Sequence, residues 1–306
     1  TFSSRGLGDV YKRQAKGLLK HYKFMVSDTI EFKSYAKINL FLHVLKKRND
    51  GYHNIVSLLS RINLFDKIIF KKCDEFKVIY NGLQSNEIIN DNISQLIFLL
   101  QKKNLINEFN YQITIDKKIP VGAGLGGGSS NVATVINALR ELKILKDNID
   151  ILSIARELGS DIEFFLYNKS ALVNEKGSVV KLIDIAKSCE ILLVNPKYNL
   201  STTEVFNLNS SYSSMNDINI TNPIVDLKAL METTSNNLEA SAFKLCPDID
   251  EIKREMRKQK NLIADRMTGS GSTYFGIFED KQASLIGQEY FKNNYPKWWT
   301  SSVRTI

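Results

Sequence analysis

The sequence predicts an α+β fold in two domains, on three observations. A glycine-rich stretch at residues 119–130 lies between a strand-like and a helix-like segment. The strand-like and helix-like segments before residue 186 form one group, and a second group follows from a strand-like run at 190–194. The chain has 306 residues, which is enough for one large or two ordinary domains. We therefore expect a domain boundary near residues 186–195.

The glycine-rich stretch predicts a loop that binds anions. It reads I-P-V-G-A-G-L-G-G-G-S-S, and its five glycines allow positive φ angles and close approach of the backbone to a ligand. The segment before it alternates apolar and polar residues, and the segment after it has apolar residues at helical spacing. We expect Ser129, Ser130 or Asn131 to cap that helix, whose free N–H groups would then face the loop. A flexible Gly/Ser linker is the alternative interpretation.

This loop differs from the two common nucleotide-binding motifs. A P-loop has a lysine after its last glycine, and Ser129 stands there instead. A dinucleotide fingerprint opens a βαβ unit, whereas this loop lies well inside the chain. Because the loop contains no lysine, a bound phosphate would need positive charge from elsewhere in the fold.

Periodicity predicts the remaining elements. In the first strand, Lys37 and Asn39 project from the same face. Asp91 is expected to cap a helix, and Gly159 to end one. We expect an antiparallel group of strands at 31–44, from 52 onward, at 67–71 and at 76–80, later strands at 171–173, 179–183, 190–194, 262–267 and 273–278, and helices at 148–158, 226–232, 237–245, 249–259 and 280–293.

Composition limits the class of protein. The apolar and charged fractions, 43% and 24%, are those of a soluble globular protein, and no apolar run approaches the length of a membrane span. Three cysteines without metal-ligand spacing favour a reducing cytoplasm. The first 24 residues carry +5 of the net charge of +8. We interpret residues 1–24 as a non-native or disordered leader before Met25, the alternative being a basic arm that binds nucleic acid.

Three segments, in this order, resemble the GHMP kinases: S-Y-A-K-I-N-L-F-L-H-V (34–44), L-G-G-G-S-S (125–130) and M-T-G-S-G-S-T-Y-F-G-I-F (267–278). The runs R-N-D-G-Y-H (48–53) and G-S-D-I-E-F-F (159–165) are similar to those of the 4-diphosphocytidyl-2-C-methyl-D-erythritol kinase family. The resemblance covers nearly everything from residue 28 onward.

The resemblance implies both a fold and an activity. The fold is an N-terminal domain like ribosomal protein S5 domain 2, over 25–188, and a C-terminal ferredoxin-like α/β plait, over 189–306, with the active site in the cleft between them. The activity is ATP-dependent phosphorylation of the C2 hydroxyl of 4-diphosphocytidyl-2-C-methyl-D-erythritol, in the methylerythritol phosphate pathway to isoprenoids. A monomer or weak homodimer is expected, with no nucleic-acid or membrane partner.

The resemblance also implies roles for individual residues. Lys37 and Asp161 would form the catalytic pair, in which Asp161 accepts the hydroxyl proton while Lys37 keeps it ionised and lies near the developing charge. Mg²⁺ would bridge the phosphates, with Ser130 as a ligand. The residues expected to bind ATP are Pro120, Val121, Gly122, Ala123, Gly124, Leu125, Gly126, Gly127, Gly128, Ser129 and Ser130, with Asn92 and Lys117 or Lys118 near the nucleoside.

The acceptor substrate needs a site for its cytidine and a site for its polyol. The resemblance implies that Tyr52, His53 and Phe206 bind the base, and that Asn39 and Thr202 lie near the erythritol. The loop at 269–272 would support the cleft from the second domain. His43, on the same strand as Lys37, is interpreted as structural.

Two positions depart from the family, and two alternative functions remain. Ala123 replaces a frequent glycine, which should have little effect, and Glu163 replaces a commoner proline near Asp161. Another small-molecule GHMP kinase, such as a homoserine or mevalonate kinase, would keep the loop and lose the cytidine contacts. A basic protein that binds nucleic acid is the second alternative, but RNA binding explains neither the five glycines nor the Asp161 segment.

Overall fold

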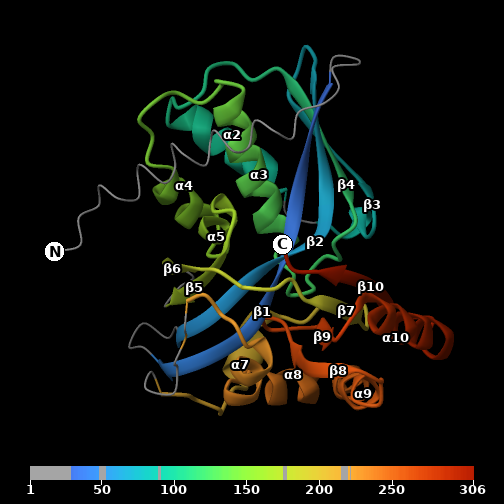
Figure 1. The fold of residues 1–306 in the computed structure, drawn as a ribbon. Coiled ribbons are helices and arrows are strands. Elements are labelled where there is room, and N and C mark those ends of the chain that lie inside the picture. The colour runs from blue at the N-terminus through green and yellow to red at the C-terminus, as the bar shows by residue number, and fades with distance from the viewer. Residues whose placement is uncertain (1–28, 48–52, 89–90, 175–177, 215–219, 221) are drawn as a thin grey trace.

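The computed structural model describes residues 29–47, 53–88, 91–174, 178–214, 220 and 222–306 (Figure 1). The predictions for residues 1–24 and Tyr52 lie outside these ranges. The elements, in chain order, are β1 (Thr29–Lys47), β2 (His53–Lys72), β3 (Lys77–Gly82), η2 (Ser85–Glu87), α2 (Asn92–Lys102), β4 (Tyr111–Lys117), α3 (Gly127–Glu141), α4 (Ile151–Leu158), α5 (Ile162–Leu166), β5 (Ser170–Asn174), β6 (Ser178–Ile183), β7 (Glu190–Asn195), α6 (Thr202–Asn207), α7 (Leu227–Thr233), α8 (Glu239–Leu245), α9 (Pro247–Met256), β8 (Leu262–Met267), β9 (Tyr274–Phe278), α10 (Lys281–Asn294) and β10 (Trp299–Arg304).

The strands form two sheets. The first has the order β3-β4-β2-β5-β6, with β1 paired to β2, and the second has the order β10-β7-β9-β8. Every pair in the second sheet is antiparallel, and its strands, numbered along the chain, lie in the order 4-1-3-2 of an α/β plait. The predicted α+β class is confirmed. The chain passes from the first sheet to the second between Ile183 and Glu190, and the exact division at 25–188 and 189–306 stays a prediction.

The long strands β1 and β2 run the length of the molecule (Figure 1). They contain 19 and 20 residues and pair antiparallel from Thr29 opposite Lys71 to Lys47 opposite His53. All residues of β1 from 36 to 44 are buried. Ile38 and Leu40 of β1 share one hydrophobic core with residues of β7 and β9. This shared core joins the two sheets.

Two predictions for the first sheet are wrong. The run at 67–71 is not a separate strand, because β2 continues without a break from His53 to Lys72. Asp66 is tolerated inside this buried strand because backbone and side-chain donors satisfy the hydrogen bonds of its carboxylate. The strand at 76–80 corresponds to β3, which pairs parallel with β4, so the group is not wholly antiparallel.

Helices α2 to α5 cover one face of the first sheet (Figure 1). The predicted apolar stripe of α3 is confirmed, since Val132, Val135, Ile136 and Leu139 are fully buried. The predicted cap of α2 is also confirmed, because the Asp91 side chain accepts hydrogen bonds from two backbone N–H groups. No helix within the described ranges is long and apolar enough to cross a membrane.

The start of α3 differs from the prediction. The helix begins at Gly127, and its N-cap is Gly126 in the left-handed conformation at φ 70°, so Ser129, Ser130 and Asn131 lie inside the helix rather than at its cap. Glycine adopts this conformation without steric cost, and the serine caps are therefore unnecessary. The short helices α5 and α6 and the last strand, β10, were not predicted.

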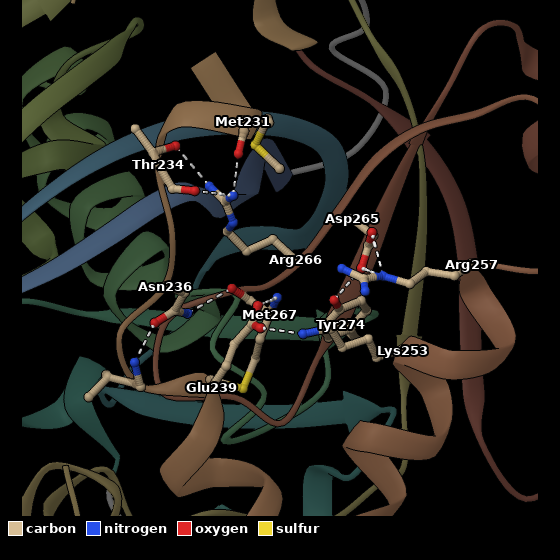
Figure 2. Close-up of polar contacts among 11 residues, drawn as sticks. Met231, Thr234, Asn236, Glu239, Lys253, Arg257, Asp265, Arg266, Met267 and Tyr274 are labelled. Atoms are coloured by element: carbon tan, nitrogen blue, oxygen red, sulfur yellow. Dashed lines mark hydrogen bonds and ion pairs between the residues drawn. The ribbon is translucent and has the colours of Figure 1, made fainter. Parts of the chain in front are cut away.

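A buried arginine ties the second sheet to β1. The guanidinium of Arg266, on β8, donates hydrogen bonds to the carbonyl oxygens of Met231 and Thr234, each at 2.6 Å, and to the Thr234 hydroxyl at 3.0 Å (Figure 2). It also donates to the carbonyl oxygen of Leu40 at 2.7 Å. Burial lowers the pKa of Arg266. Because Leu40 belongs to β1, these bonds fix the relative position of the two sheets.

Replacing Arg266 tests this tie. Arg266→Met is expected to lower the free energy of unfolding by about 3 kcal/mol, because it leaves several buried carbonyl groups without donors. Arg254→Met is the control, since Arg254 is mostly exposed and pairs with Asp250 at 3.7 Å, so a loss below about 0.5 kcal/mol is expected. Urea unfolding measures both values. Equal losses in the two variants would contradict this role of Arg266.

Candidate active site

The glycine-rich stretch forms a loop between β4 and α3, and its glycines are required by its conformation. Gly122, Gly124 and Gly126 have φ angles of 63°, 75° and 70°, in the left-handed region. A Cβ atom on Gly124 would lie 2.5 Å from the carbonyl oxygen of Thr268 and 2.9 Å from that of Gly271. The loop at 268–271 therefore packs directly against the glycine-rich loop, as the sequence predicted for 269–272.

The glycine-rich loop lines a cavity of about 460 Å³. Of the predicted ATP-binding residues, Leu125 and Ser130 do not line it, and of the two lysines considered for the nucleoside end only Lys117 does among the described lining residues. Leu125 is buried in the core shared by the two sheets, and the Ser130 hydroxyl bonds to the Tyr35 carbonyl oxygen at 2.6 Å and to the Ser34 hydroxyl at 2.8 Å. The lining consists of Tyr80, Glu87, Ile88, Asn92, Ile93, Lys117, Pro120, Val121, Gly122, Ala123, Gly124, Gly126, Gly127, Gly128, Ser129, Asn131 and Asn199.

One side chain of the cavity lining belongs to a buried ion pair. Lys117 is the one lysine or arginine among the described lining residues, and its ammonium pairs with Asp66. The Asp66 carboxylate, which is fully buried, also accepts the backbone N–H groups of Lys118 at 2.7 Å and Ile119 at 2.9 Å, and the side-chain amide of Asn131 at 3.2 Å. Asp66 thus fixes both ends of the loop. Asp66 was not predicted from the sequence.

The outer wall of the cavity is fixed by Tyr80. Its hydroxyl donates to Asp91 Oδ1 at 2.6 Å, and Asp91 also caps the helix that begins with Asn92. Burial, followed by the contact with Asp91, raises the pKa of Tyr80 far above neutral pH, so its hydroxyl stays protonated and remains a donor. The start of α2, with Asn92, is held against the cavity in this way.

The structure brings Lys37, Asn39 and Asp161 together beside the loop. Lys37 Nζ lies 3.5 Å from Asp161 Oδ2 and donates to Asn39 Oδ1 at 2.7 Å. The Lys37 side chain is 5% exposed and that of Asp161 is 33% exposed, so the carboxylate remains accessible to a ligand. The Lys37 backbone N–H donates to the Leu125 carbonyl oxygen at 3.0 Å, which places the pair next to the glycine-rich loop.

Glu163 explains how α5 holds Asp161 without the proline that the family commonly has. Its buried carboxylate accepts Arg156 Nε at 2.9 Å and the Val179 backbone N–H at 3.2 Å. The hydrogen bond with Glu163 raises the pKa of Arg156. These bonds connect α5 to α4 and to β6, so the backbone around Asp161 is fixed.

An aromatic group lies where β2 begins, against the last turn of α6. The His53 ring stacks on Phe206, with centroids 5.6 Å apart, and on Tyr212, at 6.2 Å. Thr202, one turn before Phe206 in α6, has its hydroxyl 2.9 Å from that of Ser270. The structure therefore places His53 with Phe206, and Thr202 against the loop at 268–271. Tyr212 was not predicted.

The comparisons with known proteins agree with these features. The model of the GHMP kinases N terminal domain matches residues 92–169, and that of the GHMP kinases C terminal domain matches residues 220–297. A 4-diphosphocytidyl-2-C-methyl-D-erythritol kinase from Thermodesulfovibrio yellowstonii is 35% identical over 284 residues, which cover 90% of this chain and 97% of the relative. The chain belongs to this family of GHMP kinases.

Two further relatives support membership of the 4-diphosphocytidyl-2-C-methyl-D-erythritol kinase family. The kinase of that name from Thermotoga maritima is 33% identical over 269 residues, covering 82% of this chain and 93% of the relative. A crystal structure of 4-(cytidine 5'-diphospho)-2C-methyl-D-erythritol kinase superposes with a TM-score of 0.72 and 27% identity, covering 90% of this chain and 99% of that one. The family resemblance inferred from the motifs is confirmed.

Substitution of Gly126 tests the geometry of the loop. Gly126→Ala is expected to lower the free energy of unfolding by at least about 1 kcal/mol, because the φ angle of 70° is strained for alanine and its Cβ would lie 2.8 Å from the Phe165 ring. Gly128→Ala is the matched control, since its nearest neighbour would be 3.5 Å away, inside a helix that alanine favours. Denaturant titration compares the variants, and equal stability would show that the loop conformation is different.

Proposed function

We propose that this chain transfers the γ-phosphate of ATP to the C2 hydroxyl of 4-diphosphocytidyl-2-C-methyl-D-erythritol, giving the 2-phosphate and ADP. The step belongs to the methylerythritol phosphate pathway of isoprenoid precursor synthesis. The observation that carries the proposal is the Lys37–Asp161 pair, at 3.5 Å, next to the glycine-rich loop of a chain that belongs to this kinase family.

The pair has the chemistry that the transfer requires. Phosphoryl transfer depends on an acceptor hydroxyl in line with the phosphorus and on compensation of the charge that develops. The Asp161 carboxylate is the partly exposed member and can accept the hydroxyl proton. The buried ammonium of Lys37 stabilises that carboxylate and lies on the side of the glycine-rich loop, where the phosphates would bind.

Residues of the cavity would hold ATP. The N–H groups at the start of α3 and the glycines with positive φ form a site for phosphates, and Lys117 supplies a cation. Asn92 and Lys117 would lie near the nucleoside. No group of three His, Cys, Asp or Glu side chains in the described residues could hold a metal by itself, but Mg²⁺ on a nucleotide needs only one or two protein ligands.

We propose Ser129 in place of Ser130 as the serine that would contact Mg²⁺. Ser129 lines the cavity, whereas the Ser130 hydroxyl bonds to Tyr35 and Ser34. The ion, when bound, would neutralise charge on the phosphate oxygens. The residues of this chain would orient the nucleotide and exchange the proton of the acceptor.

The aromatic group supports a proposal for the acceptor substrate. We propose that His53 and Phe206, together with Tyr52, bind the cytosine ring, and that Thr202 lies near the erythritol. We propose that Asn39 positions Lys37 rather than binding the erythritol. Its Oδ1 atom accepts a hydrogen bond from the Lys37 ammonium, and its Nδ2 atom donates to the Ser57 hydroxyl at 2.8 Å.

Three further proposals rest on composition and family alone. We propose a cytoplasmic location, consistent with the free cysteines Cys73, Cys189 and Cys246, and a monomer or weak homodimer with small-molecule substrates as its partners. We also propose that residues 25–188 and 189–306 are the two domains, each of which contains one of the matched family regions.

A product assay tests the proposed function. The protein is incubated with Mg-ATP and, separately, with 4-diphosphocytidyl-2-C-methyl-D-erythritol, homoserine or mevalonate, and the products are analysed by mass spectrometry. We expect one added phosphate on the diphosphocytidyl compound alone, because only this acceptor carries a cytosine for the aromatic group. Product from homoserine or mevalonate alone, with well-folded protein, would favour another GHMP kinase activity.

The role of Asp161 is tested by Asp161→Asn. The amide cannot accept the hydroxyl proton, so turnover is expected to fall about 1,000-fold while ATP binding, measured by titration calorimetry, stays unchanged. Asp184→Asn is the control, because Asp184 is an exposed aspartate that pairs with Lys169, and its turnover should remain near that of the parent. Near-parental turnover of Asp161→Asn would exclude Asp161 as the base.

A further inference from the structure

The position of the Lys37 ammonium depends on the side chain of Asn39. Asn39 Oδ1 is the nearest acceptor of Lys37 Nζ, at 2.7 Å, against 3.5 Å for Asp161 Oδ2. Because both Lys37 and Asn39 are buried, the ammonium has little freedom to find another acceptor in solvent. A residue that fixes the position of the Asn39 amide therefore also fixes the position of the Lys37 ammonium.

Thr268, from the second sheet's side of the cleft, fixes that amide. Its fully buried hydroxyl accepts the Asn39 backbone N–H at 3.0 Å and lies 3.1 Å from Asn39 Oδ1 and 3.2 Å from the Gly124 carbonyl oxygen. The single hydroxyl proton can go to only one of these two oxygens at a time. One side chain thus contacts both Asn39 and the glycine-rich loop.

Asn236 in turn fixes the backbone on both sides of Thr268. Its side-chain amide donates to the carbonyl oxygens of Met267 and Gly269, each at 2.8 Å, and its Oδ1 atom accepts the Leu238 N–H at 3.0 Å. Figure 2 shows the Asn236 side chain directed at Met267. Both polar atoms of this buried side-chain amide therefore bond to backbone groups.

Asn236 is itself held against β1, the strand that carries Lys37. The N–H of Leu42 donates to the Ser235 carbonyl oxygen at 3.0 Å, and the N–H of Asn237 donates to the Leu42 carbonyl oxygen at 3.0 Å. Arg266, next to Met267, donates to the carbonyl oxygen of Leu40, also on β1. The segment that carries Thr268 is therefore tied to β1 at several points, all from the second half of the chain.

We propose that Thr268 and Asn236 are positioning residues for the phosphoryl transfer, acting through Asn39 to hold the Lys37 ammonium in its place between Asp161 and the glycine-rich loop. The inference rests on the proposed function, because it assumes that Lys37 and Asp161 perform the transfer. Asn236 acts one step further away, by setting the position of the Thr268 hydroxyl.

The substitution Thr268→Val tests the first step. Valine keeps the shape of the side chain and removes the hydroxyl, so Asn39 loses its contact and Lys37 is less well placed. We expect kcat to fall about tenfold while the KM for ATP changes less than about threefold, because the loss concerns orientation rather than nucleotide binding. Thr268→Ser restores the hydroxyl and is expected to return kcat to within about twofold of the parent.

Thr305→Val is the matched control. Thr305 is also a buried threonine whose hydroxyl accepts a backbone N–H, that of Cys189 at 2.9 Å, and it lies at the C-terminal end of the chain. Its loss of thermal stability should resemble that of Thr268→Val, whereas its kcat should stay at the parental value. An equal fall of kcat in both valine variants would show a general effect of stability and would overturn the proposal.

A double-mutant cycle tests the second step. Asn236→Asp replaces the donating amide by an oxygen that faces two carbonyl groups, and we expect a fall of kcat similar to that of Thr268→Val. If Asn236 acts through Thr268, the double variant should lose no more than the more damaging single variant. Losses that multiply would overturn the pathway. Asn236→Ala, which removes the donors without adding charge, takes the place of Asn236→Asp if that variant does not fold.

The outcomes separate this proposal from the proposed function. If the parent protein shows no transfer to the diphosphocytidyl substrate, the proposed function fails. If the parent is active and Thr268→Val retains full kcat, or if Thr268→Ser is as impaired as Thr268→Val, the positioning proposal fails while the function stands.

Discussion

The site depends on one buried cation. An ammonium group such as that of Lys37 is costly to remove from water unless its hydrogen bonds and its charge are satisfied. Here a neutral amide, Asn39, supplies the shortest hydrogen bond, and Asp161 supplies an opposite charge at 3.5 Å that remains one-third exposed. The neutral partner fixes the direction of the ammonium, and the carboxylate keeps room to meet a substrate. The glycine-rich loop, Thr268 and the second sheet all pack around this arrangement.

The two sheets build the site jointly because they share a core. Residues 36–44 of β1 are all buried, and their apolar side chains pack with those of β7 and β9. Lys37 lies beside the glycine-rich loop, and the Asn39 side chain bonds to Lys37, Ser57 and Thr268. A polar pair inside such a core is tolerated only where each hydrogen-bonding group finds a partner, which explains the density of side-chain contacts at this point. At the start of the glycine-rich loop, Asp66 and Lys117 likewise satisfy each other's charge inside the core.

The sequence predicted the parts of the site that depend on local pattern. The alternation around Lys37 and Asn39 gave their shared face, the glycines gave the loop, and the motifs gave Asp161. The sequence could not identify Asp66 or Asn236, because each acts through hydrogen bonds to residues 51 and 31 positions away, respectively. The spacing of nearby residues does not predict such distant contacts. In the same way, the parallel pairing of β3 and the different surroundings of Ser129 and Ser130 are set by tertiary contacts.

The most direct test of this account is a crystal structure with a non-hydrolysable ATP analogue and 4-diphosphocytidyl-2-C-methyl-D-erythritol. We expect the terminal phosphate between the glycine-rich loop and the Lys37 ammonium, with the C2 hydroxyl at about 3 Å from the Asp161 carboxylate. A triphosphate bound away from the loop, or an acceptor hydroxyl directed away from Asp161, would contradict the account.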